Sequence, residues 1–169
     1  MVKFAEVFLK MKPGSDIALL NSIAYVIIKE GLYNKDFIQT TTEGFEEWGK
    51  TIEEYTPDFA EKITGVNKED IIKAARLYGA SRKAGIFYTM GITQHTCGTD
   101  NVSAVANLAT LTGNIGREST GVNPLRGQNN VQGASDAACL PNVYPGYQKV
   151  DVPDIQAKFE KAWGTKLSP

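Results

Sequence analysis

Apolar residues recur at helical spacing through the first half of the chain. The clearest stripe consists of Leu20, Ile23, Ala24, Ile27 and Ile28. Such a stripe buries one side of a helix against a core. Ser15 before the stripe and Gly31 after it are residue types that begin and end helices. We therefore expect a core helix between these two positions.

The same pattern predicts several shorter helices in the following segment. Their expected ranges are 36–40, 43–55, 57–63 and a stretch that begins at Asn67 and carries Ile71, Ala75 and Tyr78 on one face. Asn67 is a favourable first cap, and Pro57 suits a first helical turn. The opening segment, residues 4–11, mixes aromatic and β-branched residues with polar ones, so we expect a strand there.

The pattern changes at residues 84–91, a short apolar run bounded by glycines. Such a run after a helix is typical of a buried, parallel strand. A polar loop follows at residues 92–98, and a helix is expected over residues 100–112. A polar loop after a parallel strand lies where open α/β sheets bind ligands.

Periodicity is lost between Gly113 and Val150, in a stretch too long for an idle connector of a compact domain. Its centre, residues 121–133, holds one arginine and five side-chain amides between glycines. Glycine allows close approach of the backbone, and neutral amides both donate and accept hydrogen bonds. These properties suit a neutral heterocycle better than a phosphate, although composition alone favours a solvated turn. A final helix is expected over residues 154–163.

Composition excludes several classes of protein. The 169 residues are 42% hydrophobic and 22% charged, as in one ordinary globular domain. A net charge of −1 without a basic run argues against a nucleic-acid partner. No segment approaches the length of a membrane span, and Glu6 interrupts any signal-like apolar run, so we expect a cytoplasmic chain.

Four blocks then identify a family. They are Met90–Gln94, Leu111–Arg117, Gly121–Gly133 and Leu140–Gln148. In order and spacing they resemble the catalytic (alpha) subunit of molybdopterin-dependent formate dehydrogenases, within the wider molybdopterin oxidoreductases. Residues 9–16 resemble the same family, so the resemblance covers nearly all of the chain to Val150.

The resemblance implies a fold and a cofactor. It implies an α/β fold: a helix-rich fragment of a Rossmann-like parallel-sheet domain, with a long irregular region that faces the cofactor. Residues 1–150 would form this domain fragment and residues 151–169 a C-terminal helical extension. The implied cofactor is molybdopterin guanine dinucleotide with molybdenum or tungsten, beside which formate is oxidised to CO2.

The resemblance also assigns residues. Arg126 matches the arginine that faces formate, and its planar guanidinium suits a carboxylate. The residues matched to cofactor contacts are Met90, Gly91, Thr93, Gln94, Gln128, Asn129 and Gln132. Without the family, Arg126 would be taken for a loop arginine paired with an acid. His95 is expected to be a loop residue, or to support another residue that contacts the site.

The matched segment does not contain the metal-binding motif of the family. Neither Cys97 nor Cys139 matches it, and both are expected to be small buried side chains. The chain thus resembles an internal fragment, which is expected to be inactive alone. Its partners would be the remaining segments of the subunit, which would carry a 4Fe–4S cluster, and an iron–sulfur electron-transfer subunit. The isolated fragment is expected to self-associate. The alternatives left open are a non-catalytic cofactor-binding or assembly module, another molybdopterin oxidoreductase, and a structural remnant.

Overall fold

The computed structural model describes residues 2–168, and their contacts divide the chain into two compact units, Met1–Leu125 and Arg126–Pro169. Each unit is described by itself. The expected division after residue 150 rests on the family resemblance and stays a prediction.

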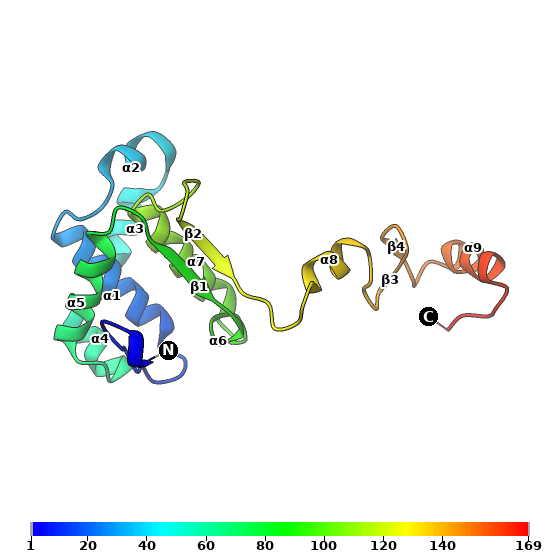
Figure 1. Cartoon of the computed structure of the whole chain (residues 1–169), viewed down its shortest axis with the longest axis horizontal. Helices are drawn as coiled ribbons and strands as arrows, with labels where there is room; N and C mark the ends of the chain where they lie inside the picture. The colour runs from blue at the N-terminus through cyan, green and yellow to red at the C-terminus, as the bar shows by residue number, and fades with distance from the viewer. Residues whose placement is uncertain (1, 169) are drawn as a thin grey trace. The chain divides into compact units, whose positions relative to one another are not determined.

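The first unit is built around helix α1 (Asp16–Lys29), as its apolar stripe predicts (Figure 1). Three helices within residues 45–79 and the long helix that follows Cys97 contact it. Its residue Ile27 is fully buried, as is Ile71, in a core to which Leu108 and Leu111 also belong. The helix ends at Lys29, and Gly31, two residues later, has a φ of 67°, a left-handed conformation that glycine adopts without strain.

The shorter helices of this unit also form where their patterns predict them. They are α2 (Lys35–Thr41), α3 (Phe45–Ile52), α4 (Pro57–Thr64) and α5 (Lys68–Gly79). Side chains cap three of them: Asn34, Thr56 and Asn67 accept hydrogen bonds from backbone N–H groups of the first turns. These caps satisfy donors that a helix leaves unpaired, so each helix begins at a defined residue.

A parallel strand pair completes the first unit. Strand β1 (Gly85–Tyr88) pairs with β2 (Gly121–Pro124) in the register Gly85↔Gly121 to Tyr88↔Pro124. Helices α6 (Met90–Thr93) and α7 (Gly98–Leu111) connect them, and α7 packs against both strands (Figure 1). The predicted parallel strand is thus confirmed, and its partner lies inside the amide-rich segment, where no strand was expected.

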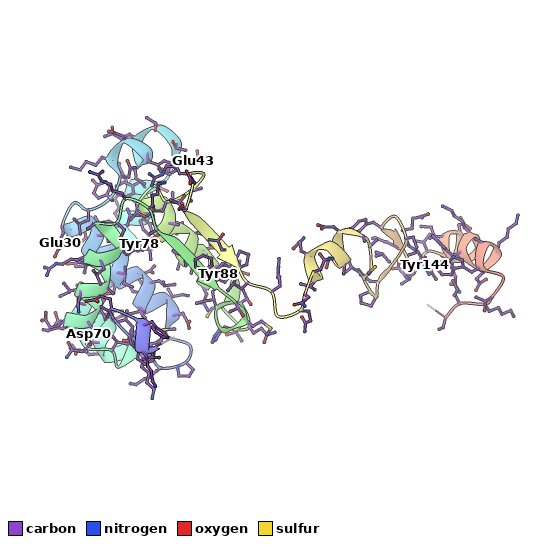
Figure 2. The ribbon with its side chains drawn as sticks, viewed as in Figure 1. Glu30, Glu43, Asp70, Tyr78, Tyr88 and Tyr144 are labelled. Atoms are coloured by element: carbon purple, nitrogen blue, oxygen red, sulfur yellow. The ribbon has the colours of Figure 1, made fainter. Side chains whose placement is uncertain are left out.

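The second unit contains α8 (Val131–Asp136), the antiparallel strands β3 (Val143–Tyr144) and β4 (Gln148–Lys149), and α9 (Pro153–Trp163). Its small core is aromatic. Tyr144, labelled in Figure 2, stacks on Phe159 with ring centroids 4.6 Å apart, and Trp163 lies 4.9 Å from Phe159. Helix α9 therefore packs on the hairpin that precedes it.

Two expectations about strands were wrong. Residues 4–11 form no strand: Val2–Phe4 is a 3-10 helix (η1), and within residues 2–168 nothing pairs with the segment that follows. The alternate residues Leu9 and Met11 nevertheless both pack against the core. Strand β1 is also not buried on both faces, since Phe87 is 67% exposed on the side opposite α7. A helix-rich fold with a small parallel sheet is confirmed, whereas two strands do not establish a Rossmann-like sheet.

Candidate functional site

The polar residues predicted after β1 occupy an exposed helical turn at the carboxyl end of that strand. Met90, Gly91 and Thr93 belong to α6, and Gln94 follows as its last cap. All four are exposed, and a Cβ placed on Gly91 would meet no atom within 4 Å. The structure thus brings these four predicted residues together on a surface with room for a ligand.

This turn is held against the start of α7 by its backbone. The Asn101 side chain, fully buried, donates from Nδ2 to the carbonyl oxygen of Ile92 across 2.9 Å. At Gly98, an added Cβ would lie 2.1 Å from the carbonyl oxygen of Thr93, so only glycine fits there. His95 Nε2 donates to the carbonyl oxygen of Gly91 at 2.9 Å, which gives this histidine the loop role expected of it.

Both strands of the pair end at the same edge. Because β1 and β2 are parallel, the α6 turn and Leu125 follow neighbouring strand ends. The N–H of Leu125 donates to the carbonyl oxygen of Tyr88 at 2.8 Å and extends the pairing by one residue. The Asn123 amide donates back to the carbonyl oxygens of Gly121 and Ile86, so it serves the strands rather than a ligand.

The loop after α7 positions β1 rather than a ligand. Asn114 is fully buried, and its Oδ1 accepts from the N–H of Ala84 and from Nη2 of Arg117, both at 3.1 Å. Arg117 also donates from Nε to Gly113 O at 3.0 Å and from Nη2 to Arg82 O at 3.1 Å. The guanidinium of Arg117 is therefore used to fasten the loop to the entrance of the strand.

Tyr78 of α5, labelled in Figure 2, has its buried hydroxyl near the side chains of Thr112 and Asn114. Within the described part of the chain no hydrogen bond of good geometry reaches this hydroxyl. Burial disfavours the phenolate and raises the pKa of Tyr78 above its usual value, more than the two nearby polar side chains lower it.

The second set of predicted residues lies in the second unit. Arg126, Gln128, Asn129 and Gln132 are all exposed. Arg126 donates from Nη2 to Oε1 of Gln132 at 2.9 Å, so two of the predicted residues contact each other directly. Asn130 has a φ of 53°, and this left-handed residue turns the chain into α8.

Electrostatically, the two sets differ. The α6 turn offers the hydroxyl of Thr93 and the amide of Gln94, which carry no formal charge, whereas Arg126 is a cation in the second set. Neutral donors and acceptors match the edges of a pterin or a guanine, and the guanidinium matches a carboxylate. The residues present therefore fit a pterin cofactor, although no cluster of three or more His, Cys, Asp or Glu in residues 2–168 is placed to hold a metal ion.

The two cysteines do not belong to either set of predicted residues. Both are free thiols; Cys97 is half-buried with its Sγ 3.7 Å from Oδ1 of Asn101, and Cys139 is exposed. The expectation that Cys139 is a buried side chain was wrong, because it follows the short helix α8 on the surface of the second unit.

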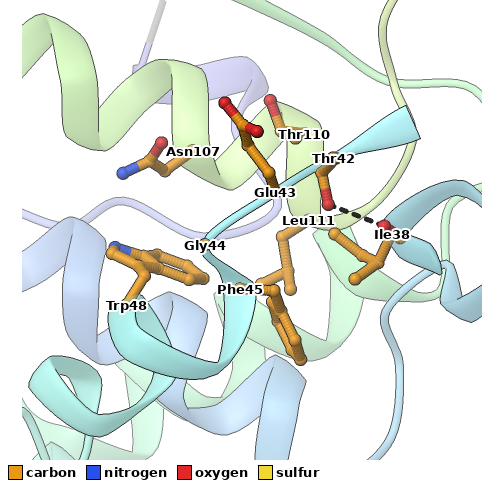
Figure 3. A pocket seen from close by; sticks show the side chains of 9 residues that line it. All are labelled: Ile38, Thr42, Glu43, Gly44, Phe45, Trp48, Asn107, Thr110 and Leu111. Carbon is orange, nitrogen blue, oxygen red and sulfur yellow. Dashed lines mark hydrogen bonds between the residues drawn. The ribbon is translucent and has the colours of Figure 1, made fainter. Parts of the chain in front are cut away.

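A separate small cavity lies between α2, α3 and α7 (Figure 3). Its volume is about 70 Å³, well below the several hundred Å³ of sites for small-molecule cofactors. Phe45 and Trp48 form an aromatic wall of this cavity. The hydroxyl of Thr42 donates a hydrogen bond to the carbonyl oxygen of Ile38 at 2.7 Å. This cavity is too small for a pterin dinucleotide.

Sequence reasoning missed the residues that hold the site in place. Asn101 shares a helix face with Val105 and Leu108, and a polar residue in an apolar stripe is the signal of a buried amide. Asn114 and Arg117 lie in a block that matched the family, but no role was assigned to them. Asp136, which accepts a hydrogen bond from Gln132, was also missed.

Comparison with known proteins identifies the family. The model of the molybdopterin oxidoreductase family matches residues 2–163, nearly the whole chain. This chain belongs to the molybdopterin oxidoreductase family. Within that family it is 54% identical over 167 residues to the alpha subunit of the F420-dependent formate dehydrogenase of Methanocaldococcus jannaschii, a match that covers 99% of this chain and 24% of that subunit.

Two further proteins are similar to this molybdopterin oxidoreductase segment. It is 50% identical to formate dehydrogenase H of Escherichia coli, over 99% of this chain and 23% of that protein. Acetylene hydratase from Pelobacter acetylenicus has a similar fold, with a TM-score of 0.67 and 28% identity over 69% of this chain and 16% of that one. The chain thus spans about a quarter of the formate dehydrogenases that it matches. None of the helices in residues 2–168 is both long and apolar enough to cross a bilayer.

Proposed function

We propose that this chain is part of the catalytic subunit of a formate dehydrogenase. In this proposal the α6 turn and the side chains of Gln128, Asn129 and Gln132 contribute to binding a bis(pterin guanine dinucleotide) cofactor, and Arg126 orients formate. The observation that carries the proposal is the 50–54% identity to formate dehydrogenases over 99% of the chain. The fold alone does not select this reaction, because the same fold occurs in a protein named for the hydration of acetylene.

The chemistry of Arg126 supports its proposed role. Formate is a carboxylate with one hydrogen, so orientation of its two oxygens sets the direction of the C–H bond. A guanidinium presents parallel N–H donors to both oxygens, keeps its charge at every physiological pH, and binds carboxylates in a fixed plane. When bound, the metal–pterin centre would accept the two electrons of formate oxidation. Arg126 would contribute by positioning and by electrostatic stabilisation.

The α6 turn supports the proposed cofactor contacts. Its backbone is fixed by Asn101 and Gly98, so the side chains of Thr93 and Gln94 are presented in a fixed arrangement. Preorganised donors bind a rigid heterocycle without the cost of ordering a loop. The open space beside Gly91 would allow a flat ring to approach the backbone.

Exposed apolar surface supports the proposal that more polypeptide surrounds this segment. Phe87 is 67% exposed on β1 and Leu125 is 54% exposed just after β2. Parallel strands are ordinarily covered on both faces. In the complete subunit this face would pack against further chain, and the strand pair would be part of a larger, Rossmann-like sheet. In isolation the same surface favours self-association, which light scattering would detect.

The test of the proposal is the substitution Arg126→Lys in the complete, cofactor-loaded subunit. A lysine keeps the charge but not the planar fork, so we expect kcat/KM for formate to fall by at least about tenfold. Arg82→Lys changes another exposed arginine and should leave formate kinetics unaltered. Unchanged kinetics for Arg126→Lys would remove Arg126 from the formate site.

The isolated 169-residue chain gives a second test. With added pterin cofactor it should not oxidise formate, because the segment that resembles the family does not contain the family's metal-binding motif. Turnover of formate by the isolated chain would contradict the proposal that it is one segment of a larger enzyme. A cytoplasmic setting stays a prediction.

A further inference from the structure

We propose that Asp136 is a positioning residue for formate, acting through Gln132 on Arg126. The inference rests on the proposed function, because it concerns how the arginine that meets formate is held. Gln132 Nε2 donates to Oδ1 of Asp136 at 3.0 Å, and Gln132 Oε1 accepts from Nη2 of Arg126 at 2.9 Å. The three side chains thus form a continuous chain of hydrogen bonds that ends at the guanidinium.

Asp136 controls which end of the Gln132 side-chain amide faces Arg126. A glutamine amide has one accepting and one donating end, and the two ends exchange places by a simple rotation. A carboxylate only accepts hydrogen bonds, so Asp136 requires the NH2 end of Gln132 to face it. The carbonyl end is then left toward Arg126, which only donates. Asp136 therefore selects the one orientation of Gln132 that can hold the arginine.

The helix on which this pair lies is itself fixed. Gln132 and Asp136 are four residues apart on α8, so their side chains lie on the same face. Ser135 accepts a hydrogen bond through its carbonyl oxygen from the hydroxyl of Tyr147, which ties α8 to the β3–β4 turn. At Gly133, an added Cβ would lie 2.3 Å from Oδ1 of Asn130, so the first turn of α8 packs closely on the residue before it.

Holding Arg126 by a neutral acceptor has a specific consequence for formate. An acid in place of Gln132 would pair with the guanidinium by charge and would compete with an anionic substrate. The amide oxygen of Gln132 occupies one N–H of Arg126 and leaves its positive charge uncompensated. Asp136 carries the negative charge one side chain further away, where it orients the amide without contacting the guanidinium.

The test compares two neutral substitutions of nearly equal size in the complete, cofactor-loaded subunit. Asp136→Leu removes the acceptor, whereas Asp136→Asn removes the charge and retains an acceptor. We expect Asp136→Leu to raise KM for formate by about fivefold to tenfold with kcat within about twofold, and Asp136→Asn to stay closer to the parent. Asp154→Leu on α9 is the control for loss of an exposed aspartate and should leave KM unaltered.

A double-mutant cycle tests whether the residues act in series. Gln132→Met should raise KM by a similar factor, and Gln132→Met combined with Asp136→Leu should be no worse than Gln132→Met alone. Residues that act through one hydrogen-bond chain show this non-additivity. Independent, multiplying effects would overturn the proposal.

A readout without turnover separates positioning from simple loss of helix stability. In the 169-residue chain labelled with 15N-glutamine, the side-chain NH2 signals of Gln132 should shift strongly in Asp136→Leu and weakly in Asp136→Asn. Equal spectra for the two variants would contradict the proposed orientation. Failure of the proposed function is distinct: there Arg126→Lys itself leaves formate kinetics unchanged. If Arg126→Lys impairs turnover while Asp136→Leu and Asp136→Asn have the same KM, only the role of Asp136 is overturned.

Discussion

The side-chain amide of Asn101 and the backbone carbonyl of Ile92 are joined by a hydrogen bond of 2.9 Å. This bond links the interior of α7 to the turn that carries Met90, Gly91 and Thr93. A fully buried side chain thus fixes an exposed one-turn helix.

Removal of that bond should loosen the turn. Asn101→Leu keeps the size of the side chain but leaves the Ile92 carbonyl without its partner, so we expect a loss of about 1–3 kcal/mol in the free energy of unfolding. Urea unfolding followed by Trp48 fluorescence in a Trp163→Phe background reports on the first unit alone. Asn107→Leu, at an exposed position of the same helix, should change the free energy by less than about 0.5 kcal/mol. Equal effects of the two substitutions would contradict the anchoring role of Asn101.

Two glycines should respond in opposite directions to alanine. At Gly98 the new methyl group would lie 2.1 Å from the Thr93 carbonyl oxygen, a backbone atom, so Gly98→Ala should destabilise the first unit by about 2 kcal/mol or more. At Gly49, inside α3, the methyl group meets no atom within 4 Å. Gly49→Ala should therefore stabilise the unit by about 0.5–1 kcal/mol through helix propensity. Thermal unfolding of both variants measures the contrast, and a neutral Gly98→Ala would mean that the α6 turn can move aside.

Tyr78 should make stability fall at alkaline pH. Burial raises the pKa of its phenol in the folded chain, whereas the unfolded chain releases this proton near the usual value of about 10. The contribution of Tyr78 is therefore fully present below about pH 10 and is lost as pH rises through the higher pKa of the folded state. Tyr78→Phe removes this loss and, because the hydroxyl has no partner among the described residues, should cost little at pH 7.

The measurement for Tyr78 is urea unfolding of the parent chain and of Tyr78→Phe from pH 8 to 11. Lysines also titrate in this range, so the difference between the two proteins is the relevant quantity. That difference should favour Tyr78→Phe increasingly above pH 10. A constant difference across the range would show that the phenol ionises equally in the folded and unfolded chains.

Arg117 should not be replaceable by lysine. Its fork donates to the carbonyl oxygens of Gly113 and Arg82 and to Oδ1 of Asn114, three acceptors that one ammonium on a flexible stem cannot reach together. We expect Arg117→Lys to lower the free energy of unfolding by about 1–2 kcal/mol and to speed hydrogen exchange at the Ala84 N–H. Arg82→Lys is the matched control, because only the backbone of Arg82 takes part in the cluster. Equal stability of the two lysine variants would refute this account.

The helices were predictable because their signals are local. The stripe from Leu20 to Ile28, the cap at Asn67 and the first-turn proline Pro57 depend only on neighbouring residues, and the structure has helices at those positions. The strand expected at residues 4–11 failed because pairing depends on a distant partner, and alternation alone does not supply one. For the same reason β2 was missed: residues 121–124 have no strand pattern of their own and are strand only because β1 lies beside them.

For the candidate site, the residues that would meet a ligand were easier to predict than those that hold them. Gln94 and Arg126 lie in segments recognised by family resemblance, and both prove to be exposed. Asn101 and Asn114 are ordinary amides in the sequence, and their importance follows from burial that only the folded chain shows. The link from Arg126 through Gln132 to Asp136 likewise requires the helix α8, in a region where periodicity predicted none.

The boundary between the two compact units falls between Leu125 and Arg126, inside the segment that the sequence presents as one motif. Leu125 continues the strand pairing by donating to Tyr88, whereas Arg126 donates its hydrogen bond to Gln132 on the helix that follows it. Mutations that alter the surroundings of the arginine can therefore accumulate in α8 without disturbing the packing of the strand pair. One motif of thirteen consecutive residues, from Gly121 to Gly133, is thus shared between two separately packed units.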